Sequence, residues 1–148
     1  MPFTDYQGGQ LKTVDSTNFE PTTLAAAEVI IEPGATREIH WHFVDEWNYF
    51  ISGQARITVF EATASRTFDY QAGDVGYIPV SDGHYIENTG TEPVHMLEIL
   101  KTPKFSDVSL GNWLALTSAN TVMETLNIDQ ETYDGIHSMY VSKQYIVK

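Results

Sequence analysis

Three histidines and one glutamate have a spacing suited to binding a metal ion: His40, His42, Glu46 and His84. His40 and His42 are two residues apart, so on a β-strand both side chains leave the same face. Glu46 keeps that parity if the strand continues, and His84 comes from a second strand about forty residues later. Imidazole nitrogens with one carboxylate oxygen suit Mn2+, Fe2+, Zn2+, Ni2+ or Cu2+. The pattern therefore predicts a metal site and leaves the metal open.

The elements that must position these side chains are short β-strands separated by turns. Their expected ranges are 24–31, 38–42, 47–52, 54–60, 66–70, 75–78, 84–88 and 94–100. Strands of this length and spacing predict an all-β sandwich or barrel. Gly34 and Gly53 are expected at turns where the chain reverses, and Asn88 is expected to satisfy backbone groups near a strand end. The aromatic residues are expected to fill the core and the pocket wall: Trp41, Trp47, Trp113, Tyr49, Phe50 and Tyr77.

The two ends of the chain differ in character from this middle. Residues 1–20 are polar and turn-rich and are expected to form an N-terminal arm, residues 21–116 a barrel, and residues 117–148 a helical tail. The tail is expected to hold two helices, one capped by Thr117 or Ser118 and one beginning at Asp129 or Thr132 and ending near Tyr140. We expect this tail to pack on the barrel or on a partner subunit.

Composition excludes several classes of function. The chain has 148 residues, a net charge of −12 and no cysteine. This suits one domain with a sizeable core, and it excludes disulfides and thiolate ligands. The negative charge argues against nucleic acid or an anionic membrane as a partner. No signal peptide or membrane-spanning stretch is visible, so a cytoplasmic protein is expected, with a trimmed leader as the alternative.

The spacing resembles the two motifs of the cupin superfamily, Gly34-x5-His40-x-His42-x3-Glu46-x6-Gly53 and Gly73-x5-Pro79-x4-His84-x3-Asn88. Ser81 stands where the second motif usually has glycine. Flanking stretches resemble oxalate decarboxylases in particular, from about Gly8 to Thr117. Examples are Arg37-Glu38-Ile39-His40-Trp41-His42, Gly83-His84-Tyr85-Ile86-Glu87-Asn88 and Trp113-Leu114-Ala115-Leu116-Thr117. Those proteins usually carry two cupins in one chain, whereas this chain has room for one.

The resemblance implies a jelly-roll barrel, manganese as the metal, and two further residues at the site. In the family an arginine at the position of Arg37 points at the substrate, although strict alternation would face it away from His40. A twist or bulge in that strand would reconcile the two. The family also places a glutamate at the position of Glu98 beside the metal. Burial of Glu98 among apolar neighbours would raise its pKa and suit it as a general acid, while the alternative is a structural carboxylate hydrogen-bonded to Arg37.

One departure from the family concerns the proton donor. The oxalate decarboxylase cupin thought to do most of the chemistry has a Ser-Glu-Asn-Ser lid, whose glutamate gives the proton. Here the corresponding stretch is Lys104-Phe105-Ser106-Asp107-Val108-Ser109, which lacks a glutamate. It resembles the family's other cupin instead, with Asp107 as a weak substitute for the lid glutamate.

The leading hypothesis is a manganese-dependent cupin enzyme that decarboxylates oxalate to formate and CO2, with dioxygen as co-reactant. The first alternative is a cupin oxidase, dioxygenase, lyase or isomerase acting on another small carboxylate or oxygenated metabolite. The second is a metal-binding cupin without catalysis. The expected partner is a small anionic carboxylate substrate, and all three hypotheses include a bound metal ion. A homo-oligomer, with a dimer as the first expectation, would replace the packing that a two-cupin chain has internally.

Overall fold

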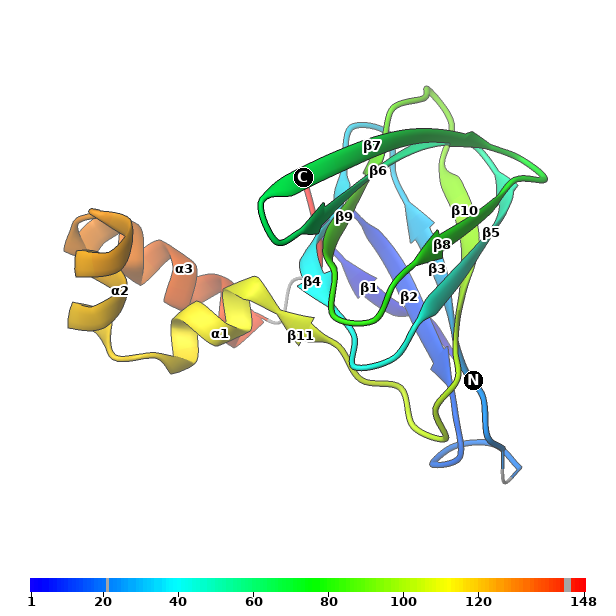
Figure 1. Ribbon diagram of the computed structural model, residues 1–148, viewed down its shortest axis with the longest axis horizontal. Helices are drawn as coiled ribbons and strands as arrows, with labels where there is room; N and C mark the ends of the chain where they lie inside the picture. The colour runs from blue at the N-terminus through cyan, green and yellow to red at the C-terminus, as the bar shows by residue number, and fades with distance from the viewer. Residues whose placement is uncertain (21, 143–144) are drawn as a thin grey trace.

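Two antiparallel sheets form a barrel with helices beside it in the computed structural model, which describes residues 1–20, 22–142 and 145–148 (Figure 1). The first sheet has the order β1 (Thr4–Tyr6), β2 (Gly9–Val14), β3 (Ala25–Ile31), β10 (Val94–Leu100), β5 (Glu46–Ser52) and β8 (Val75–Ile78). The second has the order β11 (Val108–Ser109), β4 (Thr36–Trp41), β9 (Gly83–Asn88), β6 (Gln54–Glu61) and β7 (Ala64–Gln71), and β12 (Ile146–Val147) also pairs with β4. Pro21, where the sequence analysis begins the barrel, lies outside the described residues, as do residues 143 and 144 of the tail. The predicted all-β barrel with short C-terminal helices is confirmed.

Alternation along the strands divides each sheet into an inner and an outer face. In β3 and β10 every second residue is buried, as the two-residue period of a strand requires. The buried apolar residues form one core inside the barrel, with Val29, Ile31, Phe50, Ile57, Ile86 and Met96 among its members. The same inner face carries the polar residues of the site described below. The barrel interior therefore holds both an apolar core and a group of buried polar side chains.

The outer face of β5 and β8 is unexpectedly aromatic. The side chains of Trp47, Tyr49 and Tyr77 are 52%, 44% and 46% exposed, and Trp113 of the helical region is 59% exposed. The prediction that they fill the core and pocket wall is wrong for these four, while Phe50 is fully buried. The reason is strand parity: Glu46, Asn48 and Phe50 occupy the inner positions of β5, so Trp47 and Tyr49 must face outward.

Two turns depend on positive φ angles. Gly53, between β5 and β6, has a φ of 84°, and a Cβ atom there would lie 2.6 Å from the carbonyl oxygen of Pro93. Ser81, between β8 and β9, has a φ of 68°, and its N–H donates to the carbonyl of His42 at 2.9 Å. A left-handed residue is easiest for glycine, which explains physically why a glycine suits the position of Ser81.

Three helices lie on one side of the barrel and join it through β11 (Figure 1). They are α1 (Leu110–Leu116), α2 (Ala119–Leu126) and α3 (Gln130–Ser142). Helix α1 was not expected from the sequence; its cap is Ser109, whose hydroxyl accepts from the N–H of Asn112. The other two helices are those predicted for the tail, with Ser118 at the N-cap of α2. Within the described residues, no helix has the length and apolar character to cross a membrane.

A candidate metal centre

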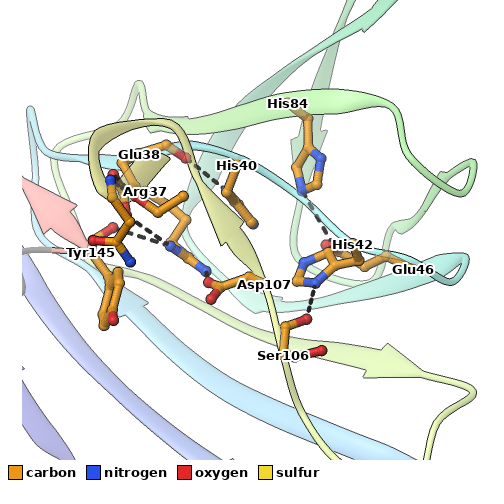
Figure 2. A network of polar contacts seen from close by, with 11 residues as sticks. Arg37, Glu38, His40, His42, Glu46, His84, Ser106, Asp107 and Tyr145 are labelled. Atoms are coloured by element: carbon orange, nitrogen blue, oxygen red, sulfur yellow. Dashed lines mark hydrogen bonds and ion pairs between the residues drawn. The ribbon is translucent and has the colours of Figure 1, made fainter. Parts of the chain in front are cut away.

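Four side chains from the two sheets of the barrel meet in its interior (Figure 2). His40 lies in β4 and His42 just beyond it, Glu46 begins β5, and His84 lies in β9. All four are buried, and one donor atom from each lies within 4.8 Å of the others. The pairing of β4 with β9 sets His40 directly opposite His84, which brings in the residue that is distant in sequence. The geometry thus assembles the group that the spacing predicted.

Each histidine is held through its outer ring nitrogen by a backbone carbonyl. The Nδ1 atom lies 2.7 Å from the Glu38 oxygen in His40, 2.8 Å from the Ser106 oxygen in His42, and 3.0 Å from the Asp82 oxygen in His84. A carbonyl can only accept, so Nδ1 carries the proton in each neutral ring. The Nε2 atoms then keep free lone pairs that face the centre, which is the tautomer a metal ligand needs.

The inward atoms of the group have no hydrogen-bond partners among the described residues. This holds for the three Nε2 atoms and for both carboxylate oxygens of Glu46. Glu46 Oε2 nevertheless lies 2.9 Å from Nε2 of His42 and 3.2 Å from Nε2 of His84. Buried polar atoms are rarely left unpaired in proteins, so a cluster of them facing one point fits a divalent cation.

Arg37 is fully buried beside this group because β4 is irregular. Its register with β9 shifts between Arg37 and His40, so both residues point into the barrel although they are three apart. A bulge adds a residue to one strand and restores the inward direction. The irregularity that the sequence analysis required to bring Arg37 inward is therefore present.

The Arg37 guanidinium is already engaged by the protein. One nitrogen forms an ion pair with Asp107, and another donates to the Tyr145 carbonyl at 3.4 Å (Figure 2). Burial alone would lower the pKa of Arg37, but Asp107 and, more weakly, Glu98 hold it above its ordinary value. Asp107 was expected only as a weak substitute for a lid glutamate, and this ion pair was not predicted. No local pattern links residues seventy positions apart.

Glu98 lies in β10 on the inner face, fully buried, with neither oxygen hydrogen-bonded to a described residue. Burial and the neighbouring Glu46 carboxylate raise the pKa of Glu98 to about 7, while Arg37 opposes them. Glu98 therefore does not form the structural hydrogen bond to Arg37 that was the alternative expectation. A carboxyl that holds its proton near neutral pH can donate it to a neighbouring ligand.

The segment 103–107 closes one side of the site. The Phe105 ring packs edge-on against His42 at 5.8 Å between centroids. The carbonyl of the next residue, Ser106, binds the His42 ring, and Asp107 forms the ion pair with Arg37. The segment is itself fixed to the N-terminal region, because the N–H of Phe105 donates to Asp15 at 2.8 Å. Sequence reasoning had no signal for Asp15, which is an ordinary acidic residue in a turn.

The profile of the cupin family matches residues 2–134 of this chain. The chain belongs to the cupin family. Among curated relatives, this cupin is 50% identical over 131 residues to oxalate decarboxylase OxdC of Bacillus subtilis, covering 86% of this chain and 34% of the relative. It is 46% identical over 144 residues to a probable oxalate decarboxylase of Arthroderma benhamiae, covering 95% and 35%. The cupin chain thus spans about a third of the length of these relatives.

Solved structures agree with the fold of this cupin. A structure of Bacillus subtilis oxalate decarboxylase described for its Mn(II) centres superposes with a TM-score of 0.94 and 45% identity, covering 100% of this chain and 39% of that one. A second structure of that enzyme, at pH 4.6, gives a TM-score of 0.87 and 47% identity, covering 90% and 36%. Both likenesses are strong enough to fix the jelly-roll arrangement around the four side chains.

Proposed function

We propose that this cupin chain is a manganese-dependent enzyme that decarboxylates oxalate to formate and CO2. The observation that carries the proposal is the placement of the buried, unpaired Glu98 carboxyl in the same interior as four inward-facing side chains that can hold a metal. The relatives named as oxalate decarboxylases, and the Mn(II) centres described for one of them, support the choice of substrate and metal. Because the chain spans a third of those relatives, the activity is assigned to it as a hypothesis.

In this proposal His40, His42, Glu46 and His84 are the metal ligands. They supply three neutral nitrogens and one charge of −1, so a divalent ion would keep a net charge of +1 for an anionic ligand. When bound, manganese supplies a Lewis acid for the carboxylate and a centre for one-electron redox chemistry with dioxygen. The carbonyl partners of the three Nδ1 atoms hold the rings in place for this role.

Arg37 and Glu98 act on the substrate in this proposal. The Arg37 guanidinium binds and polarises one carboxylate of oxalate once Asp107 shares or releases it. Glu98 delivers a proton to the carbon that loses CO2, so the C–C bond breaks and a C–H bond forms. Oxalate dianion plus one proton then gives formate plus CO2, with no net oxidation. If protonation fails, oxidation to two CO2 with peroxide as the second product competes.

The test combines elemental analysis of the purified protein with an oxalate assay. Protein loaded with Mn(II) should form formate and CO2 in equal amounts and little peroxide. Replacing Glu98→Gln should keep the metal content and remove formate, because the amide cannot give up a proton. Glu28→Gln is a matched control: Glu28 lies on the outer face, bonded to His95 at 2.8 Å and to Lys12. No conversion of oxalate by metal-loaded protein would refute the proposal.

A second candidate keeps the metal site and changes the substrate to another small carboxylate or oxygenated metabolite. The ion pair of Arg37 with Asp107 favours an uncharged oxygenated metabolite within this candidate, because any carboxylate must compete with one already in place. A non-catalytic metal-binding cupin is the limiting case, in which Asp107 holds Arg37 permanently. Activity profiling with a series of small acids distinguishes these candidates from an oxalate enzyme.

We also propose that the protein forms a homodimer through the outer face of β5 and β8. Apolar side chains gather there with no described residue covering them: Trp47, Tyr49, Ile51, Val75 and Tyr77 are all more than 40% exposed. Apolar patches of this kind mark association surfaces on soluble proteins. The pairing of β5 with β8 makes the patch continuous.

A further inference from the structure

Asn48 is a buried carboxamide that the proposed mechanism does not use. It is 1% exposed, and neither Oδ1 nor Nδ2 has a hydrogen-bond partner among the described residues. Burying an amide without partners costs free energy, and most buried amides in proteins are paired. The residue therefore destabilises the fold at a place where an apolar side chain of the same size would fit.

Asn88 shows what a structural asparagine in this barrel looks like. Its Nδ2 donates to the carbonyls of Ile31 at 2.8 Å and Glu92 at 2.9 Å, and its Oδ1 accepts from the N–H of Gly90 at 2.9 Å. The two asparagines are both buried, yet only Asn88 is used by the backbone around it. The contrast points to a ligand as the missing partner of Asn48.

The strand register places Asn48 at the site. On one side it lies directly opposite Glu98 of β10, and on the other side opposite Gly76 of β8. Directly opposed side chains of a sheet have Cβ atoms about 4.5–5.5 Å apart. Along β5, Asn48 is two residues from Glu46, or about 7 Å on the same face. The Asn48 carboxamide thus lies beside Glu98, the proposed proton donor. It is also close enough to Glu46 for one small molecule to contact both the carboxamide and the proposed metal.

In the row of inward positions that contains Asn48 and Glu98, the next residue on either side is small. Gly76 lies beyond Asn48 and Ala27 beyond Glu98, and both are buried. The next row along the sheet carries Met96 and Phe50 instead, so the interior is filled there by large apolar side chains. The Asn48 carboxamide and the Glu98 carboxyl therefore lie side by side in the interior, and both lack partners among the described residues.

We propose that Asn48 is a substrate-contacting residue that binds the carboxylate of a small acid. The proposal rests on the proposed function, because the acid is the one held at the metal. The Nδ2 group donates to a carboxylate oxygen, while Arg37 lies on the facing strand β4 and supplies the charged contact. The large buried side chains of the next row, Phe50 and Met96, would limit the length of that acid.

The experiment compares Asn48→Leu with Asn88→Ala in protein loaded with Mn(II). Binding of oxalate, malonate and succinate is measured by calorimetry, and the melting temperature is measured on metal-free protein. Asn48→Leu should keep the metal content, melt at the wild-type temperature or higher, and bind oxalate about tenfold or more weakly. Asn88→Ala should melt at a lower temperature and bind oxalate as the wild type does. Wild type should prefer oxalate to succinate.

Two results would overturn the assignment of Asn48. One is unchanged oxalate binding in Asn48→Leu, and the other is a fall in melting temperature as large as that of Asn88→Ala. Failure of the proposed function gives a different result. Wild type would then bind the acid without producing formate, while Asn48→Leu would still bind the acid more weakly than Asn88→Ala. Wild type that binds none of the three acids would overturn both the proposed function and the role of Asn48.

Discussion

At the Glu98 carboxyl, burial and the Glu46 charge both raise the pKa, to about 7 in the metal-free protein. The folded state therefore holds a proton between an unfolded pKa of 4.5 and a folded pKa of about 7. The stability associated with that proton is complete below pH 4.5 and is lost as the pH rises through 7. A shift of this size corresponds to roughly 3 kcal/mol. Denaturant unfolding of metal-free wild type should show this loss, and Glu98→Gln should lack it. Equal pH slopes in the two proteins would contradict the shift.

The same carboxyl should govern the pH dependence of turnover. In the proposed mechanism the protonated form of Glu98 is the donor, so kcat/KM for oxalate should fall on the alkaline side as Glu98 loses its proton. A bound divalent ion lowers the pKa of a nearby carboxyl, which puts this limb at or below pH 7. A pH–rate profile of protein loaded with Mn(II) measures it. An activity that rises through pH 7 and 8 would exclude Glu98 as the donor.

Replacing Asp107→Asn should have opposite effects on stability and on binding. The buried Arg37 guanidinium loses its anionic partner, which should lower the free energy of unfolding by roughly 2–4 kcal/mol. The released guanidinium should bind oxalate more tightly, because it no longer has to leave a carboxylate. Chemical denaturation and calorimetry measure the two effects. Weaker oxalate binding in this variant would show that Asp107 holds Arg37 in place for the acid and does not compete with it.

At the scale of the elements, the turn between β5 and β6 depends on the absence of a side chain at Gly53. Gly53→Ala should lower the free energy of unfolding by about 2 kcal/mol or more, since the new Cβ would lie 2.6 Å from the Pro93 oxygen and the φ is positive. Gly34→Ala is the matched control, with a φ of 75° but no atom within 4 Å, and should cost about 1 kcal/mol. Equal losses of unfolding free energy in the two variants, measured by thermal or denaturant unfolding, would mean that the positive φ alone causes the loss and that the contact with Pro93 does not add to it.

The sequence predicted those parts of the site that depend on short-range spacing. His40, His42 and Glu46 follow from strand parity, and the strands, the turn glycines and α2 follow from local patterns. The partners of Arg37 could not be predicted, because Asp107 and Tyr145 come from remote segments that tertiary packing brings to β4.

The outward direction of Trp47 and Tyr49 was missed for a different reason. Residue type suggests burial, but position on the strand decides which face a side chain occupies, and Glu46, Asn48 and Phe50 already take the inner face. Asn48 gave no signal at all as a sequence position. Only the register against Glu98 and the lack of partners distinguish it from the other asparagines.

For the whole molecule, the exposed aromatic face of β5 and β8 predicts the state of assembly. Trp47→Glu should convert a dimer to a monomer, because it places a charge within the apolar patch without touching the inner face. Light scattering after size exclusion measures the mass. Phe60→Glu is the control: Phe60 is 53% exposed but belongs to β6 in the other sheet, so its dimer should persist. A monomeric wild type would refute the interface.

Consecutive residues of segment 103–107 hold two different parts of the interior, since the Ser106 carbonyl fixes the His42 ring and Asp107 binds Arg37. An anion that draws Arg37 away from Asp107 therefore also disturbs the anchor of one proposed metal ligand. The affinities for anion and cation are then thermodynamically linked, and the coupling free energy is the same whichever ligand binds first. Titrating Mn(II) with and without oxalate, in wild type and in Asp107→Asn, would measure that coupling as a ratio of dissociation constants.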